Sequence, residues 1–120
     1  MNIIDHAETL RALDHNVHIP AGNVVISIAV GEHSYCRPKV NALPFAAYER
    51  IELAVIEPPR PNDWIRFIVP ESCEMSGIKA PWLNRFAHLF GSDQVAGYIT
   101  WEDAQAIVDA ACDAAESETV

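Results

Sequence analysis

Apolar side chains alternate with polar or small ones along three stretches of the chain, which is the period of a β-strand. Over 23–30, β-branched residues recur at every second position, so we expect a largely buried strand. Over 49–57, one face is apolar and the other carries charges, which predicts a half-buried strand. A third strand is predicted over 64–69. The proline-rich loop 58–63 would join the last two in an antiparallel hairpin.

Nearer the carboxyl end the apolar period changes to 3.6 residues, which is typical of helices. Pro81 suits the first position of a helix over 81–90, and Gly91 suits the residue just after its end. A second helix is predicted over 101–115, with the Thr100 hydroxyl as its N-terminal cap. Each of these helices has one apolar face, so both are expected to pack on the sheet.

A short helix is also expected at the amino end of the chain. Asp5 suits its N-cap, and Ala7, Leu10 and Leu13 would face inward at helical spacing. Because strands precede helices without alternating, the fold class is predicted to be α+β. We expect a small antiparallel sheet of about three strands, with two C-terminal helices packed on one face. The chain of 120 residues fits a single domain over 1–120.

Charge is distributed unevenly along this sequence. The formal net charge is -9 at pH 7, yet 1–85 is nearly balanced, whereas 86–120 holds seven acidic side chains and no Lys or Arg. On the predicted last helix, four of these carboxylates fall within about 60° of one another, opposite the apolar face. We call them the acidic stripe, which consists of Glu102, Asp109, Asp113 and Glu116.

Two interpretations of the acidic stripe are open from the sequence. A charged helix face can serve solubility alone. Such faces usually mix signs, because opposite charges four residues apart stabilise a helix by about 0.2–0.5 kcal/mol and like charges lose a similar amount. Asp109 and Asp113 are such a like-charged pair, and Asp113 and Glu116 also approach the negative end of the helix dipole. The alternative to solubility is therefore attraction of a basic partner surface.

Pairs of potential metal ligands occur at a spacing that zinc sites use. His15 and His18 form one pair, and His33 and Cys36 form another. The predicted strand 23–30 lies between the pairs and would hold them about 25 Å apart unless the chain doubles back. Zinc needs its ligands within about 2.3 Å of the metal. We therefore predict no metal site and no cofactor, and we keep a small metal-binding or Cys/His-dependent protein as an alternative.

No catalytic signature is recognisable in this sequence. Neither Cys36 nor Cys73 has a glycine-rich oxyanion segment beside it, and the acidic neighbours of Cys73 would suppress its thiolate. The glycines are isolated and cannot cradle a phosphate. The carboxylates of the acidic stripe would stay in water, whereas acid catalysis needs a desolvated one. We expect a protein that is not an enzyme and has no catalytic residues.

Composition predicts a soluble cytoplasmic protein. No apolar run approaches the roughly 20 residues of a membrane-spanning helix, and the first residues resemble no signal peptide. The three cysteines are odd in number and scattered, which fits reduced thiols. A negative surface repels phosphate backbones, so direct nucleic-acid binding is not expected unless basic residues cluster in space.

The long connection 32–48 is a second candidate binding region. It is too long for a tight hairpin and carries Tyr35, Arg37 and Lys39, which we predict to contact a partner. The alternative is that its aromatic side chains, Tyr35, Phe45 and Tyr48, fold back and close the open end of the core.

Three short stretches resemble small phage or prophage proteins of unassigned role, over roughly two thirds of the chain. They are 35–39 (Tyr-Cys-Arg-Pro-Lys), 48–52 (Tyr-Glu-Arg-Ile-Glu) and 95–99 (Val-Ala-Gly-Tyr-Ile), the last leading into the final helix. Small acidic phage proteins include anti-CRISPR and other anti-defence inhibitors, some of which imitate the charge of DNA. The resemblance implies a protein of this class in the host cytoplasm, but it assigns no role to any residue.

Together these observations predict a non-enzymatic acidic protein that engages a basic surface of a protein or of a nucleic-acid-processing complex. A homo-oligomeric structural protein is a further alternative, and a homodimer is left open. Such self-association would need an exposed apolar surface, for which the apolar face of 82–90 is the best candidate.

Overall fold

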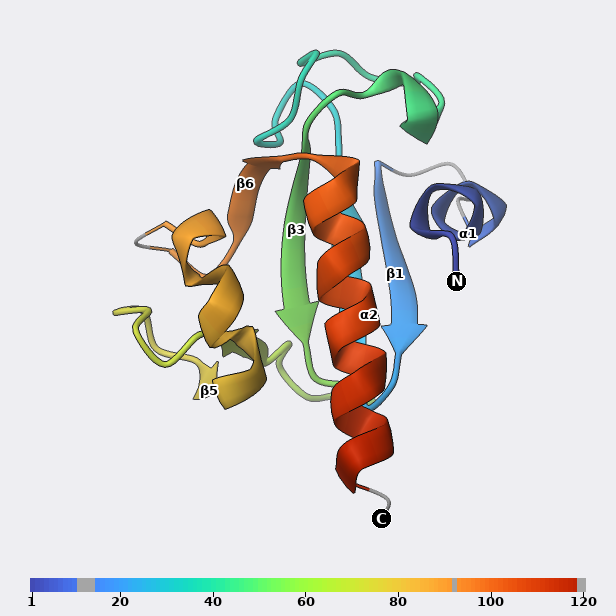
Figure 1. Cartoon of the computed structure of the whole chain (residues 1–120). Coiled ribbons are helices and arrows are strands. Elements are labelled where there is room, and N and C mark those ends of the chain that lie inside the picture. The colour runs from blue at the N-terminus through green and yellow to red at the C-terminus, as the bar shows by residue number, and fades with distance from the viewer. Residues whose placement is uncertain (11–14, 92, 119–120) are drawn as a thin grey trace.

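A six-stranded sheet with helices on one face forms the fold, as a computed structural model shows (Figure 1). The structure describes residues 1–10, 15–91 and 93–118. The α+β class, the C-terminal helix and the N-terminal helix are confirmed, whereas the expectation of about three strands was too low. The helical elements are α1 (Ile3–Leu10), η1 (Phe45–Ala47), η2 (Pro81–Leu89) and α2 (Trp101–Glu118). The strands are β1 (Asn16–Ala21), β2 (Val24–Ala29), β3 (Ile51–Ile56), β4 (Phe67–Val69), β5 (Ile78–Lys79) and β6 (Ala96–Ile99).

Strand β3 is the centre of the sheet. It pairs antiparallel with β2 along one side. On its other side, β6 pairs with Ile51 and Leu53, and β4 pairs with Val55 and Ile56, so two short strands share one long neighbour. The predicted hairpin of β3 and β4 is thus confirmed as an antiparallel pair. Only the β4–β5 pair among the described strands is parallel.

Strand β1 is the largest element that the sequence prediction missed. Its buried residues, Val17, Ile19 and Ala21, alternate with exposed ones, as in a half-buried strand. Pro20 argues against a central strand, but β1 lies at the sheet edge, where a missing N–H is tolerated. Gly22, at φ +60°, makes the turn into β2. Strands β5 and β6 were missed because two and four residues are too short to show a period.

The N-terminal helix begins earlier than predicted. The Asn2 side chain accepts the Asp5 N–H at 3.1 Å, so Asn2 rather than Asp5 satisfies a free donor of the first turn. Ala7 is buried as expected, but Leu10 is 45% exposed, so its predicted inward orientation was wrong. Leu13 lies outside the described residues.

Most of the core lies between the sheet and the layer formed by α1, η2 and α2 (Figure 1). Helix α2 contributes mainly small side chains to this layer, and they let its backbone approach the sheet closely. A Cβ added at Gly22 would lie 2.6 Å from the Ala111 carbonyl oxygen. The buried side chains of α2 are Ala104, Ile107, Val108, Ala110 and Ala111.

The predicted helix over 81–90 is present as the 3-10 helix η2, with Pro81 at its first turn. Leu83, Phe86 and Phe90 point into the core of this chain. Most of the apolar face of 82–90 is therefore used inside the molecule, so it is not the exposed apolar surface that self-association would need. Nor is any described helix long and apolar enough to cross a membrane.

The opposite face of the sheet is covered by no helix in the described part of the chain. A small apolar cluster of Val25, Ala54 and Ile56 lies there, with Phe67 and Val95 against it. The predicted strand over 64–69 is shorter than expected on this side. Trp64 and Ile65 precede β4 and are 89% and 55% exposed, so they are not paired in the sheet.

Candidate functional site

Helix α2 displays the acidic stripe on a rigid element. The helix begins where predicted, because the Thr100 hydroxyl accepts the Asp103 N–H at 3.1 Å. Behind the stripe, Ile107 and Val108 are fully buried against the sheet and fix the rotation of the helix. All four carboxylates of the stripe, Glu102, Asp109, Asp113 and Glu116, are exposed on the opposite side.

A hydrogen-bonded glutamine connects the stripe to the amino end of the chain. Gln105 Nε2 donates to Asp109 Oδ1 at 3.0 Å and to the Met1 carbonyl at 2.7 Å. Its Oε1 accepts the Ile3 N–H at 2.9 Å. Asp109 is therefore held by a side chain that also bonds α1, and the middle of the stripe has a fixed position.

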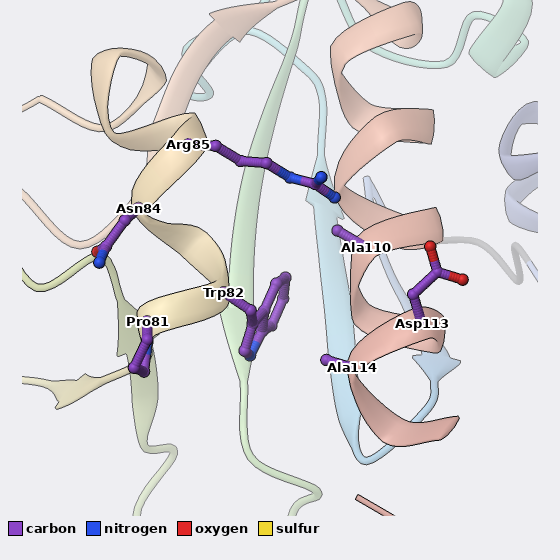
Figure 2. Close-up of a pocket in the computed structure, with 7 residues that line it drawn as sticks. All are labelled: Pro81, Trp82, Asn84, Arg85, Ala110, Asp113 and Ala114. Atoms are coloured by element: carbon purple, nitrogen blue, oxygen red, sulfur yellow. The ribbon is translucent and has the colours of Figure 1, made fainter. Parts of the chain in front are cut away.

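A groove of about 490 Å³ lies between η2 and α2, beside the stripe (Figure 2). In the figure, the Trp82 ring lies between the two elements, and Ala110 and Ala114 are on the side of α2 that faces it. Small alanine side chains leave this space open, whereas larger ones would fill it. The residues that line the groove are Pro81, Trp82, Asn84, Arg85, Ala110, Asp113 and Ala114.

The folded chain brings a cation close to α2, although the sequence from 86 onward contains no Lys or Arg. Arg85 extends from η2 toward α2 in Figure 2, and its guanidinium lies 5.0 Å from the centroid of the Phe86 ring. Asp113, a member of the acidic stripe, lines the same groove. The groove thus joins an apolar floor to two opposite charges, and Asp113 belongs both to the stripe and to the groove.

The other predicted contact residues lie in a separate group. The ring centroids of Tyr35 and Tyr98 are 5.8 Å apart, and the Lys39 ammonium lies 5.8 Å and 5.6 Å from them. The Arg37 guanidinium is 5.7 Å from the Tyr98 centroid, and Arg50 Nη1 donates to the Tyr98 carbonyl at 3.4 Å. We call these five residues the tyrosine–cation cluster.

The alternative interpretation of 32–48, in which its aromatic side chains close the core, is correct for two of the three aromatics, and the predicted partner contacts of this loop stay a prediction. Phe45 and Tyr48 are buried, and the Tyr48 hydroxyl donates to the Val40 carbonyl at 2.6 Å, so these aromatics do close the core. Tyr35 remains 47% exposed. Sequence reasoning missed Tyr98 and Arg50, because only the pairing of distant segments brings them to the loop.

Lys39, a member of the cluster, and Glu52, beside it, each have a shifted pKa. The pKa of Lys39 is raised, chiefly by a hydrogen bond with the Tyr98 side chain, so the ammonium keeps its charge. The pKa of Glu52 is raised mainly by partial burial and also by Asp93. Glu52 lines a cavity of about 170 Å³ on the uncovered sheet face, together with His18 and Phe67.

The distance argument against zinc was wrong, because β1 and β2 double back as a hairpin. His15 accepts the Val30 N–H at 2.8 Å through its carbonyl, so it lies near the start of the loop that holds His33 and Cys36. Cys36 is buried, however, and its thiol donates to the Gly31 carbonyl at 3.2 Å. Among the described residues, no three His, Cys, Asp or Glu side chains are grouped so that they could hold a metal ion.

Comparisons with known proteins add no assignment. No protein-family model, curated protein or solved structure matches this chain.

Proposed function

We propose that this protein is a non-enzymatic acidic binding protein whose acidic stripe engages a basic surface of a partner protein. The observation that carries the proposal is the display of Glu102, Asp109, Asp113 and Glu116 on one exposed face of a packed helix. Because this helix is fixed to the core by its other face, the four carboxylates keep their relative positions. A preorganised charge array loses little entropy on binding and steers an oppositely charged partner.

The groove beside the stripe supports a contact that is more specific than charge alone. Trp82 offers an apolar floor, and Asp113 lines the same groove with its carboxylate directed away from the Trp82 ring (Figure 2). A Lys or Arg side chain has an apolar stem and a charged end, so its stem would lie on Trp82 while its charge extends past α2 toward the carboxylates of the stripe. Tryptophan is also enriched among residues that dominate binding energy at interfaces.

The resemblance to small phage proteins directs the choice of partner. We propose that the basic surface belongs to a nucleic-acid-processing complex, where a carboxylate array would occupy a groove that normally holds phosphates. A pull-down from host lysate at low and at high salt tests this proposal. A partner of this kind is expected to bind at low salt and to be released at high salt, because added ions screen exposed charges.

Charge reversal tests the stripe itself once that partner is in hand. We expect the triple variant Glu102→Lys, Asp109→Lys and Asp113→Lys to weaken binding about tenfold or more, mainly through slower association. Isothermal titration calorimetry and stopped-flow kinetics measure the two quantities.

A matched control keeps the same change in net charge. It reverses three exposed carboxylates elsewhere, as Asp5→Lys, Glu32→Lys and Glu74→Lys. This control is expected to alter affinity much less than the stripe variant. Equal losses in both variants would show that only net charge matters, and unchanged affinity in the stripe variant would remove the stripe from the interface.

A further inference from the structure

We propose that the tyrosine–cation cluster is a second binding surface, which takes a carboxylate-bearing segment of a protein. It is formed by Tyr35, Arg37, Lys39, Arg50 and Tyr98. Its sign is opposite to that of the acidic stripe, so the two surfaces cannot share one uniformly basic partner face. This inference stands on the cluster itself and does not rest on the function proposed for the stripe.

None of the ion pairs found among the described residues involves a cation of the cluster. The ion pairs seen among the described residues are Glu32 with His33 and Asp63 with Arg66. Within that part of the chain, no carboxylate oxygen lies within 4.0 Å of Arg37, Lys39 or Arg50. Glu52 interacts electrostatically with Lys39 but makes no ion pair with it, so the three cations, in a chain of net charge -9, form a local positive region that an external anion would compensate.

Backbone hydrogen bonds hold the cluster in place. The Arg37 N–H donates to the Arg50 carbonyl at 3.0 Å, and the Arg37 carbonyl accepts the Glu49 N–H at 2.8 Å. The Tyr98 N–H donates to the Tyr35 carbonyl at 2.8 Å, which joins the loop to β6. Three segments that are distant in sequence thus form one rigid support. Because Arg37 and Lys39 also lie over the tyrosine rings and Arg50 donates to the Tyr98 carbonyl, the cations are partly ordered before a ligand arrives.

The backbone is unusual where it presents Tyr98. This residue has φ +55°, in the left-handed region that side-chain-bearing residues rarely adopt. Just before it, a Cβ added at Gly97 would lie 2.9 Å from the Cβ of Tyr35, so the close approach of the two segments requires glycine there. Strained and closely packed backbone of this kind occurs preferentially at binding sites. Tyr35 and Tyr98 nevertheless stay 47% and 39% exposed, which leaves them accessible to a partner.

Charge around the cluster favours a short acidic protein segment over a nucleic acid. Glu49 is exposed beside the loop, and Asp93 contributes to the raised pKa of Glu52 nearby. Glu102 also follows Tyr98 closely in the sequence and is exposed on α2. A long polyanion would be repelled by these acids on leaving the cluster. A segment with one to three carboxylates would be matched by the three cations, and tyrosine and arginine are frequent anchors of protein interfaces.

A titration of the ¹⁵N-labelled protein at low salt with N-acetyl-triglutamate amide tests the assignment. We expect saturable chemical-shift changes at the backbone amides of Tyr35, Lys39 and Tyr98. The variant Arg37→Ala with Lys39→Ala is expected to bind the peptide about fivefold more weakly or worse. The matched control, Arg60→Ala with Arg66→Ala, removes two exposed cations elsewhere and is expected to bind as the natural chain does.

Different outcomes of the same titration would overturn the proposal. They are an absence of saturable shifts, equal shifts with N-acetyl-triglycine amide, or equal loss of binding in both double variants. Tighter binding of inorganic phosphate or of a short oligothymidylate than of the triglutamate would assign the cluster to phosphates instead. If the cluster variant does not fold, as judged by circular dichroism, the single exposed change Lys39→Gln replaces it, and unchanged peptide affinity in that variant counts against the proposal.

Discussion

The environment of Glu52 disfavours the charged form of its side chain. It lies on the uncovered sheet face, where partial burial raises the pKa of its carboxyl group and Asp93 raises it further. The Tyr35 N–H, 3.5 Å from Oε1, and the Lys39 ammonium act in the opposite direction but do not cancel the effect of burial. The native state therefore binds the Glu52 proton more tightly than the unfolded chain does.

We expect Glu52→Gln to raise the melting temperature at pH 7. At a pH above the raised pKa, Glu52 is ionised in both the folded and the unfolded chain, so the cost of burying the charge is fully present and the neutral amide removes it. As the pH falls from above the raised pKa to below the ordinary value of 4.5, Glu52 takes up its proton and the gain should disappear. Thermal melts at several pH values measure this difference. Glu49→Gln, at an exposed position, controls for net charge; a gain for Glu52→Gln that stays constant down to pH 4 would contradict the explanation.

Exposure separates the residues that stabilise the fold from those left free for contacts. Leu53 is fully buried in the central strand, and Leu53→Ala is expected to lower the free energy of unfolding by about 2–5 kcal/mol. Trp64 is larger but 89% exposed, so Trp64→Ala should change the free energy of unfolding by no more than about 0.5 kcal/mol. Urea denaturation of both variants provides the measurement. A large loss in the Trp64 variant would show that this side chain is packed.

Among the structural elements, α2 depends most on close approach to its neighbours. Its alanine-rich face allows the helix to lie against the β1–β2 turn, where Gly22 meets the Ala111 carbonyl and the Ala115 side chain. The same small residues leave the groove open on the side of η2. One compositional feature, alanine on two sides of the helix, therefore determines both the packing of α2 and the shape of the candidate site.

The variant Gly22→Ala is expected to destabilise the protein by at least about 1–2 kcal/mol. The left-handed φ of +60° is unfavourable for alanine, and the added Cβ would lie 2.6 Å from the Ala111 carbonyl oxygen. Gly91→Ala is the control, because its Cβ would meet only Asp93 Oδ1 at 3.8 Å among the atoms described. Chemical denaturation should show a loss for the first variant only. Similar stability of the two would mean that the turn does not hold α2.

Stability and binding should respond in opposite directions at Asp113. Its negative charge lies four residues after Asp109 and in the C-terminal half of α2, so Asp113→Lys is expected to stabilise the helix by about 0.3–1 kcal/mol. The same change should weaken binding of the basic partner, which the affinity measurements above would detect. A loss of both stability and binding would instead indicate that Asp113 has a structural role.

For the whole molecule, the order of strands in the sheet predicts which strands are the last to unfold locally. β2 and β3 are each paired on both sides and carry five of the twelve largest fully buried side chains, whereas β5 has two residues at the sheet edge. In native-state hydrogen exchange we expect the slowest amides in β2 and β3, and much faster exchange in α1 and β5. Equal protection of β5 and β3 would contradict this order.

How far the sequence predicted this molecule depended on the length of each pattern. The 3.6-residue period of 101–115 was long enough to place α2 and to orient its carboxylates correctly. Strand β1 was not predicted, because it contains Pro20. A proline is tolerated in an edge strand, but the sequence does not show which strand lies at the edge. Missing β1 then led to the wrong distance between His15 and Cys36. Tyr35, Arg37 and Lys39 of the tyrosine–cation cluster were singled out from the sequence, whereas Tyr98, in β6, and Arg50, just before β3, reach them only through the tertiary structure.

The sequence by itself determined the fold class, the central strands and the acidic stripe, because each depends on local periodicity or on charge counted along one helix. Tertiary structure alone decided which strands pair, that Arg85 comes near α2, and that Tyr35 lies against Tyr98. Such contacts depend on register and on close packing between segments far apart in the chain, and no local pattern contains that information. For this reason, one charged surface was visible in the sequence, while the composition of the other became clear only from the folded chain.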